Sequence, residues 1–434
     1  MDTTKTKVPV FPILLINFIS TLGYSIILPF LVILVLKLGG NELSYGFLGA
    51  TYSAFQFVGA PILGNWSDKF GRKKILLLSE AGTFAGWLLF LIAIYLPAKQ
   101  LAIHSGFLKI FLNTVPLFLL FISRAIDGLT GGNISVANAY LADISAKEDR
   151  KKNFGKISAS ANLGFIIGPA LAGVLGATAL GVSLPVIAAL LVSLAGLFAI
   201  AFSLKDIKPH AVGAAVNEIA VNKVLGQESK DCYTAETPEK TSFFTVLKLP
   251  NVSYFLVLYF LIFLGFNFFY VSFPVYVVQQ LKWNLFQLGI FFAVLSGILV
   301  IVQGPILSRL SSLISASKMI IAGNLMLTVA FTLFCSKSML LIYIGVLFFS
   351  FGNGIMWPSF LALLSNVAGN RYQGAVQGFA GSAGSIASII GLITGAFIYR
   401  IFGASIFLLA AAFMVIIAIS AYRLVSIEKN SGNN

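Results

Sequence analysis

Residues 64–74 read GNWSDKFGRKK, and this short polar stretch separates two long apolar runs. Gly64 would let a neighbouring helix approach closely, and Gly71 would allow a tight turn. Asp68 is an acid among four basic residues, so it can pair with Arg72 or face the positive N-terminus of a neighbouring helix. This pattern indicates a charged contact that holds helices together in one arrangement only. A plain basic loop is the alternative.

The chain around this stretch has the composition of a membrane protein. Of its 434 residues, 58% are hydrophobic and 10% are charged, whereas soluble domains are about one quarter charged. So few charges cannot cover a water-exposed surface, and lipid must therefore surround much of the protein. Because a helix crosses the bilayer core with about 20 apolar residues, we predict an all-α membrane protein of twelve transmembrane helices. The predicted spans are 10–36, 44–64, 75–96, 115–142, 154–178, 182–204, 251–280, 285–308, 319–335, 338–366, 372–399 and 402–425.

The basic residues indicate how these helices are oriented. With the N-terminus in the cytoplasm, the inner segments hold 22 of the 29 Lys and Arg residues and the outer segments hold 6. Because cytoplasmic loops are rich in Lys and Arg, both termini are predicted to be cytoplasmic. The same placement explains the net charge of +14 without a nucleic-acid partner. The first apolar run is too long for a signal peptide, so we expect it to be retained as a helix.

One long polar segment divides the chain. Residues 205–250 contain six Lys and six acidic residues, and we predict a flexible cytoplasmic linker there. This division leaves a six-helix N-terminal bundle in residues 1–204 and a six-helix C-terminal bundle in residues 251–434.

Short internal matches support two halves of similar architecture. Pro-Ile-Leu at 61–63 ends the second predicted span, and the same tripeptide at 305–307 ends the eighth, each before a basic loop. Gly-Gly-Asn at 131–133 in the fourth span corresponds to Gly-Asn-Gly at 352–354 in the tenth. Each match is short, but their common order is typical of the repeats in secondary transporters.

Three motifs in sequence order resemble one family. Residues 64–74 resemble the loop signature of the major facilitator superfamily. Residues 120–131, LFISRAIDGLTG, resemble its fourth-helix motif, and residues 164–173, GFIIGPALAG, resemble its fifth-helix antiporter motif. Together they resemble the drug/proton antiporters that include the tetracycline efflux proteins. The resemblance spans nearly the whole chain. It implies two pseudo-symmetric bundles around a central cavity that opens to one side of the membrane and then to the other.

The resemblance also implies roles for particular residues. Conformational gating falls to the loop and to an acid at the end of the fourth span: Gly64, Asp68, Gly71, Arg72, Lys73 and Asp143. Ordinary solvation of a helix end is the alternative for Asp143. Antiport is linked to a series in the fifth span: Gly164, Gly168, Pro169 and Gly173. Small residues in this series also allow close packing against another span.

A pair of charges lies inside the fourth predicted span. Arg124 is the one basic residue well within a span, and Asp127 lies three residues further along the same helical face. A buried guanidinium needs a polar cavity or a partner, so the two residues form either a structural ion pair or part of a transport pathway. Residues 240–427 contain no Asp or Glu, so a proton-coupling carboxylate must lie in the first half. The candidates for the proton-coupling group are Glu80, Asp127 and Asp143, and we favour Asp127; since Glu80 lies about one turn into the third predicted span, reaching the membrane interface is its alternative role.

Polar and aromatic side chains within the spans are candidates for a substrate cavity. A wall of this composition suits an amphipathic or weakly polar solute. Helix packing is the alternative role for each of them. The candidates are Tyr24, Tyr52, Gln56, Asn138, Asn162, Asn267, Tyr270, Gln303, Asn353, Trp357 and Gln377.

These observations favour a transporter over other classes of protein. The sequence holds no nucleophile–base pair, phosphate loop or His, Cys and Asp cluster, so we expect no enzyme, no cofactor and no metal site. We expect efflux of a small organic solute in exchange for protons, by a monomer in the lipid bilayer of a bacterial inner membrane. Uptake or facilitated diffusion of a nutrient, sugar or metal chelate is the alternative, and a receptor or scaffold with this fold is a third reading.

Overall fold

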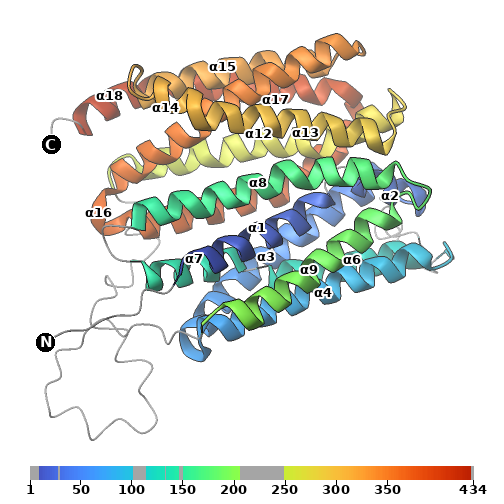
Figure 1. Cartoon of the computed structure of the whole chain (residues 1–434). Coiled ribbons are helices and arrows are strands. Elements are labelled where there is room, and N and C mark those ends of the chain that lie inside the picture. Colours follow the sequence, from blue (N-terminus) through green and yellow to red (C-terminus); the bar gives the residue numbers. More distant parts are fainter. Residues whose placement is uncertain are drawn as a thin grey trace, which may run out of the picture.

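The computed structural model describes residues 9–27, 30–100, 114–131, 133–145, 150–205 and 249–431. In this part of the chain the helices run roughly side by side in an elongated bundle (Figure 1), and no β-strand occurs. The predicted all-α membrane fold is therefore confirmed. Most of the predicted linker, residues 206–248, lies outside the described residues.

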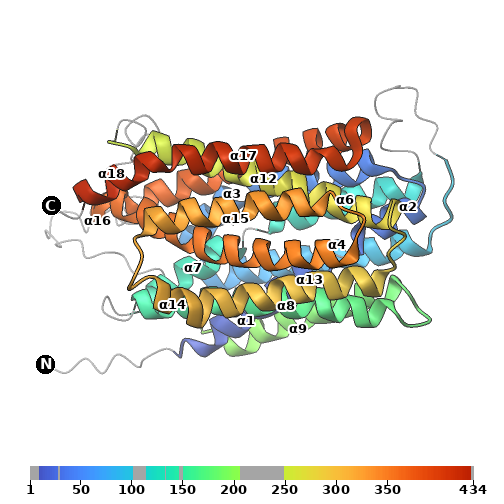
Figure 2. The same cartoon turned by 90° about the horizontal axis from the view of Figure 1, so that it is seen from above.

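Helices of the N-terminal half are α1 (Phe11–Ile26), α2 (Leu31–Lys37), α3 (Glu42–Phe70), α4 (Arg72–Tyr95), α6 (Val115–Thr130), α7 (Asn133–Ile144), α8 (Arg150–Gly176) and α9 (Ser183–Ser203). Helices of the C-terminal half are α12 (Val252–Gln279), α13 (Leu285–Ile301), α14 (Leu307–Leu310), α15 (Ala316–Phe334), α16 (Met339–Phe402), α17 (Ile406–Ser420) and α18 (Tyr422–Ser431). Figure 2 shows that α18 ends at the same end of the bundle at which α1 begins.

The helices are long enough for several membrane crossings. Eight described stretches are long and apolar enough to cross a membrane, or nine when the bent pair α1 and α2 counts as one span. One of these stretches, Phe379–Lys429, has 51 residues, which is more than two crossings of about 20 residues require. Helix α16 has 64 residues, or about 96 Å, and its ribbon turns back where Figure 1 labels it. The protein is therefore a multi-pass membrane protein, and the number twelve stays a prediction.

Two predicted spans contain breaks that the sequence pattern did not predict. The span 115–142 consists of two helices, because α6 ends at Thr130 and the chain continues through glycine. The span 285–308 contains a π-helical turn at Val302–Ile306. Pro305 lies in this turn, where it lacks the N–H group that a regular α-helix needs.

Helices α3 and α13, which belong to the second predicted span of each half, begin in the same way. Asn41 caps α3 by accepting a hydrogen bond from the Ser44 backbone N–H at 3.0 Å, and the Ser44 hydroxyl contacts the Asn41 N–H in return. Asn284 caps α13 by accepting from the Gln287 N–H at 2.9 Å, with the same reciprocal contact from Gln287. These capping boxes satisfy backbone N–H groups that helix starts leave free.

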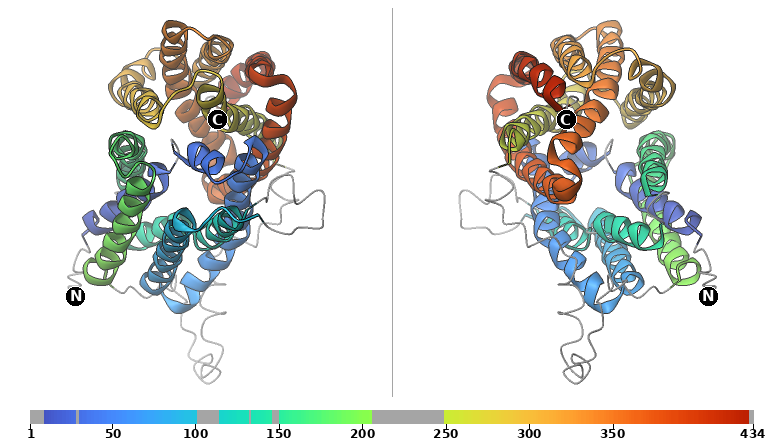
Figure 3. Two further views of the ribbon diagram at one scale, coloured as in Figure 1. Left: turned by 90° about the vertical axis from the view of Figure 1, so that its right-hand side faces the viewer. Right: turned by 90° about the vertical axis from the view of Figure 1, so that its left-hand side faces the viewer.

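The two halves lie side by side and meet along two helix pairs. Figure 3 shows the helices coloured blue to green on one side and those coloured yellow to red on the other. Helix α3 packs against α16, and α8 packs against α13. Close to one end of the bundle, Glu42 of α3 forms an ion pair with Arg400 of α16 at 3.6 Å.

Glycine allows the closest approach at both crossings. A Cβ atom added to Gly46 would lie 2.5 Å from the Cβ of Ala396 in α16. A Cβ atom added to Gly173 would lie 2.9 Å from the Cα of Gly289, so α8 and α13 touch backbone to backbone. Such contacts leave no space for a larger residue.

We expect Gly289→Ala to destabilise the protein, because the added methyl group meets the Gly173 backbone. Overpacking of this kind costs about 1–3 kcal/mol. Gly297→Ala, in the same helix, is the control, since nothing lies within 4 Å of a Cβ atom there. Thermal unfolding of the purified variants measures the difference, and equal melting temperatures would contradict the proposed crossing.

Candidate functional site

A cavity of about 490 Å³ lies between the two halves. Helices α1, α2, α3, α6 and α8 line it from the N-terminal half, and α12, α13 and α16 line it from the C-terminal half. Seven of the residues predicted for a substrate cavity line it: Tyr24, Tyr52, Gln56, Asn162, Asn267, Tyr270 and Asn353. A side-chain hydrogen bond crosses from one half to the other, because Asn162 donates to Gln303 at 3.3 Å.

Three other predicted cavity residues, Asn138, Gln303 and Trp357, are not among the residues that line this space. Asn138 lies half-buried on α7, away from the cavity wall. Trp357 packs instead against the rings of Tyr259 and Phe263, with centroids 5.2 Å and 5.4 Å apart. The side chain of Gln377 lies outside the described residues.

Other lining residues were missed because they resemble ordinary helix surface in the sequence. They include Tyr45, Ser53, Phe165, Phe263, Phe292, Ser296 and Ser388. On α3 a signal was present: Tyr45, Gly49, Tyr52, Ser53 and Gln56 all line the cavity and recur with helical spacing on one face.

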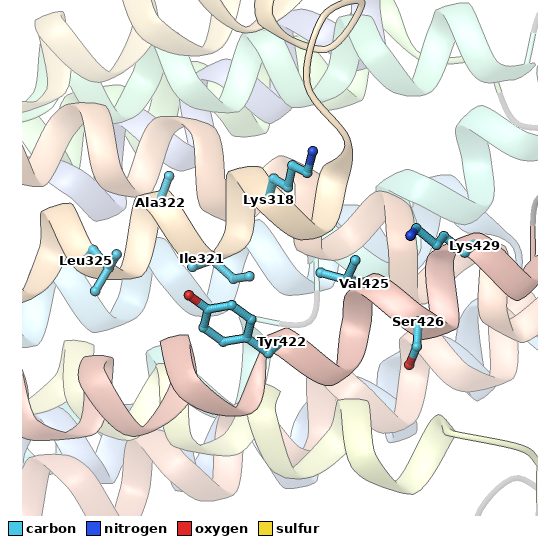
Figure 4. A pocket seen from close by; sticks show the side chains of 8 residues that line it. All are labelled: Lys318, Ile321, Ala322, Leu325, Tyr422, Val425, Ser426 and Lys429. Carbon is cyan, nitrogen blue, oxygen red and sulfur yellow. The ribbon is translucent and has the colours of Figure 1, made fainter.

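A second hollow, of about 600 Å³, lies between α15 and α18 (Figure 4). Lys318, Leu325, Tyr422 and Lys429 are among the residues that line it. All of its lining belongs to the C-terminal half, so movement of one half against the other cannot expose it to alternate sides. The cavity between the halves is therefore the candidate site.

Of the predicted pair of charges, Arg124 lies in the wall of this cavity and Asp127 lies beside it. Arg124 is 2% exposed and lines the cavity, and its Nη1 atom lies 3.2 Å from Oδ2 of Asp127. The guanidinium carbon also lies 5.0 Å from the Trp87 ring centroid, 5.2 Å from that of Phe90 and 5.8 Å from that of Tyr52. Rings at these distances stabilise a buried cation.

Glu80 does not lie at the membrane interface. It is 1% exposed, so the alternative role given for it there is wrong. The Ser20 hydroxyl donates to its Oε2 at 3.0 Å and the Ser193 hydroxyl donates to its Oε1 at 3.1 Å. The carboxyl group therefore sits where α4 meets α1 and α9, and serine donors replace the water that it would meet at the interface.

The predicted polar loop of residues 64–74 is helical apart from Gly71, since it forms the end of α3 and the start of α4, and it is tied to its own half. Arg72 donates from Nε to Asp143 at 2.9 Å and from Nη1 to the Ser67 hydroxyl at 2.6 Å, and it pairs with Asp68. Lys73 donates to the Ala201 carbonyl at 2.7 Å, near the C-terminus of α9. These contacts join α3, α4, α7 and α9.

The two glycines of the loop differ. Gly71 has a φ of +97°, which only glycine adopts without strain, and it separates α3 from α4. Nothing lies within 4 Å of a Cβ atom added to Gly64, so the close helix contact expected there is not made in this conformation.

The predicted antiporter-motif residues lie on α8, between its two neighbours. Gly164 meets the backbone of α1 at Leu22, and Gly168 meets it at Ile26, each 2.9 Å from an added Cβ atom. Gly173 meets α13, and Pro169 lines the cavity. One helix thus packs within its own half and touches the other half.

Comparison with known families gives a match over most of the chain. The model of the Major Facilitator Superfamily matches residues 13–312 and 255–434. The chain belongs to this superfamily. The predicted family resemblance is thereby confirmed, and the protein is a transporter rather than an enzyme.

Individual relatives are distant but cover most of the chain. The tetracycline resistance protein of class D from Salmonella ordonez is 27% identical over 402 residues, 89% of this chain and 88% of the relative. Multidrug resistance protein 2 from Bacillus subtilis is 25% identical over 400 residues, 90% and 88% of the two chains.

Solved structures show the same fold. The human organic anion transporter MFSD10 (TETRAN) superimposes with a TM-score of 0.65 at 20% identity, over 97% of this chain and 100% of that one. The D-xylose-proton symporter superimposes with a TM-score of 0.72 at 15% identity, over 95% and 96% of the two chains.

A double-mutant cycle tests the contact between Arg72 and Asp143. We expect Arg72→Ala and Asp143→Ala to be less destabilising together than the sum of the single changes, by about 0.5–3 kcal/mol, because both remove one contact. Denaturant titration of the purified protein measures the free energy of unfolding. The control cycle pairs Lys73→Ala with Asp143→Ala and should be additive, since Lys73 contacts Ala201. Additive effects in the first cycle would rule the coupling out.

Proposed function

We propose that this transporter exports a small organic solute in exchange for protons. The observation that carries the proposal is a cavity lined by both halves, in which Arg124 is the one charged residue among the described lining residues and the carboxyl group of Asp127 lies 3.2 Å from it. The names of the tetracycline and multidrug resistance proteins among its relatives support efflux.

In this proposal Asp127 carries the proton. Its carboxylate pairs with Arg124 and accepts a hydrogen bond from Thr83 of α4, so protonation weakens a contact in the cavity wall. Because residues 240–427 contain no Asp or Glu, the C-terminal half offers no membrane carboxyl group as an alternative. Glu80 is the second candidate, since it is a buried acid on α4, the helix that also carries Thr83.

Gating in this proposal uses contacts at opposite ends of the bundle. The Arg72 and Asp143 contact belongs to the end that holds the polar loop. The Glu42 and Arg400 ion pair and the Gly46 crossing join the halves at the other end. Alternating access would break and re-form the Glu42 and Arg400 contact between the halves, whereas the Arg72 and Asp143 contact lies within the N-terminal half and would hold that end of the half together.

The remaining features of the proposal concern topology. We propose twelve spans in two bundles, residues 1–204 and 251–434, with both termini and the loop at 64–74 in the cytoplasm. We also propose a monomer in a bacterial inner membrane. The 22 to 6 distribution of basic residues supports the orientation.

Orientation can be tested by labelling cysteines from outside the cell. In a variant with Cys232→Ser and Cys335→Ser, a membrane-impermeant maleimide should label Leu180→Cys in intact cells and leave Leu313→Cys unlabelled. Both positions are well exposed, at 57% and 80%, so access to the reagent depends on the side of the membrane. The reverse labelling pattern would overturn the proposed orientation.

Asp127→Asn should abolish proton-coupled transport, because the amide cannot exchange a proton at neutral pH. In everted vesicles with an acidic interior, solute entry through an exporter releases protons, and a pH-sensitive dye reports this release. Tetracycline is the first probe of a panel of amphipathic compounds. Lys318→Gln, which alters the hollow between α15 and α18, should behave like the wild type.

Two results would count against the proposal. Full proton release by Asp127→Asn would rule out Asp127 as the proton carrier. Accumulation of the probe in right-side-out vesicles, driven by the inward proton gradient, would identify an importer instead.

A further inference from the structure

We infer that the transported solute is an organic anion, and that Arg124 binds its negatively charged group. This inference rests on the proposed function, because it names the class of substrate for the same cavity. The charge of the cavity wall is the first observation in its favour. Of the described residues that line the cavity, Arg124 is the only charged one.

The guanidinium of Arg124 has one edge without a partner. Nη1 lies against Asp127, whereas Nε and Nη2 are buried and have no hydrogen-bond partner among the described residues. Buried N–H groups of a charged side chain are costly when they are left unpaired. A pair of guanidinium N–H groups in this planar fork matches the two oxygens of a carboxylate or phosphonate.

This edge can receive an anion without loss of the existing ion pair. Asp127 uses Nη1, so a ligand on Nε and Nη2 does not compete for the same nitrogen. Because both free nitrogens are buried, a ligand must move part of the wall to reach them. Tyr24 and Tyr52 line the cavity with ring centroids 5.1 Å apart, and the Tyr52 ring centroid lies 5.8 Å from the guanidinium carbon, so these rings are the nearby part of the wall.

A cationic solute finds no comparable partner. Glu80 lies among serine donors and does not line the cavity, and Asp127 is turned toward Arg124. The aromatic wall could bind a cation by itself, but the guanidinium already lies near the Tyr52 ring at 5.8 Å and repels a second positive charge.

The other residues of the cavity wall indicate what the uncharged part of the solute is like. Aromatic rings come from both halves, including Phe165, Phe263 and Phe292. Amide groups of Gln56, Asn162 and Asn353 add hydrogen-bonding positions. The volume of about 490 Å³ is that of a site for a drug-sized molecule. An aryl carboxylate or aryl phosphonate combines these properties.

The test compares three probes of one shape and different charge. 2-Naphthoate is the anion, 2-naphthamide is the neutral analogue, and 2-naphthylmethylammonium is the cation. Binding to the purified protein is measured by isothermal titration calorimetry. We expect the wild type to bind the anion at least about 10-fold more tightly than either of the other two probes, because a hydrogen-bonded buried charge is worth about one to two factors of ten.

Variants connect this preference with Arg124. Arg124→Gln should weaken binding of 2-naphthoate by about 10- to 100-fold. Since that change leaves Asp127 buried without its partner, the double variant Arg124→Gln and Asp127→Asn removes both charges and keeps the shape. It should show the same loss. Lys318→Gln removes one positive charge outside the cavity and should bind the anion like the wild type.

The outcomes separate this inference from the proposed function. Tighter binding of the cation, an unchanged anion preference in the double variant, or binding of none of the three probes would overturn the inference. Proton-coupled efflux of other solutes would still stand in those cases. Tight, Arg124-dependent binding of 2-naphthoate without any proton-driven transport would instead overturn the proposed function and keep the anion site.

Discussion

The lack of water in the bilayer core constrains every polar group of this protein. Backbone groups are satisfied within helices, and charges persist only where other groups compensate them. Arg124 meets this requirement in part, with one carboxylate and three aromatic rings, while its Nε and Nη2 have no partner among the described residues. Glu80 meets it with two hydroxyl groups. Gln56 donates to the Gly131 carbonyl at 3.2 Å, so this carbonyl at the break between α6 and α7 has a side-chain partner.

The two halves differ in the kinds of side chain that they contain. Acidic groups within the predicted spans belong to the N-terminal half, since residues 240–427 contain no Asp or Glu. The C-terminal half instead contains a cluster of aromatic rings, in which Phe269, Phe273 and Phe334 lie with centroids 5.0–5.1 Å apart. Such packing gives this half a rigid apolar interior.

Much of the fold and part of the site could be predicted from the sequence. Apolar runs predict helices because a helix satisfies its own backbone hydrogen bonds in the hydrocarbon core. Seven cavity residues were found because a polar side chain within an apolar run usually faces a cavity or a polar partner. The burial of Glu80 could not be predicted, since its serine donors come from α1 and α9, far away in sequence. The open edge of Arg124 could not be predicted either, because it depends on which nitrogen Asp127 contacts. The break at Gly131 could not be predicted either, because the hydrogen bond to its carbonyl comes from Gln56 of α3, far away in sequence.

The crossing of α8 and α13 consists of main chain alone at Gly173 and Gly289. A joint without side chains has no rotamers to rearrange, so its geometry does not depend on the residues that surround the cavity. Substitutions in the cavity wall can therefore alter which molecules fit while the joint keeps its shape. This separation offers a physical route by which proteins with one common scaffold diversify their substrates over evolutionary time.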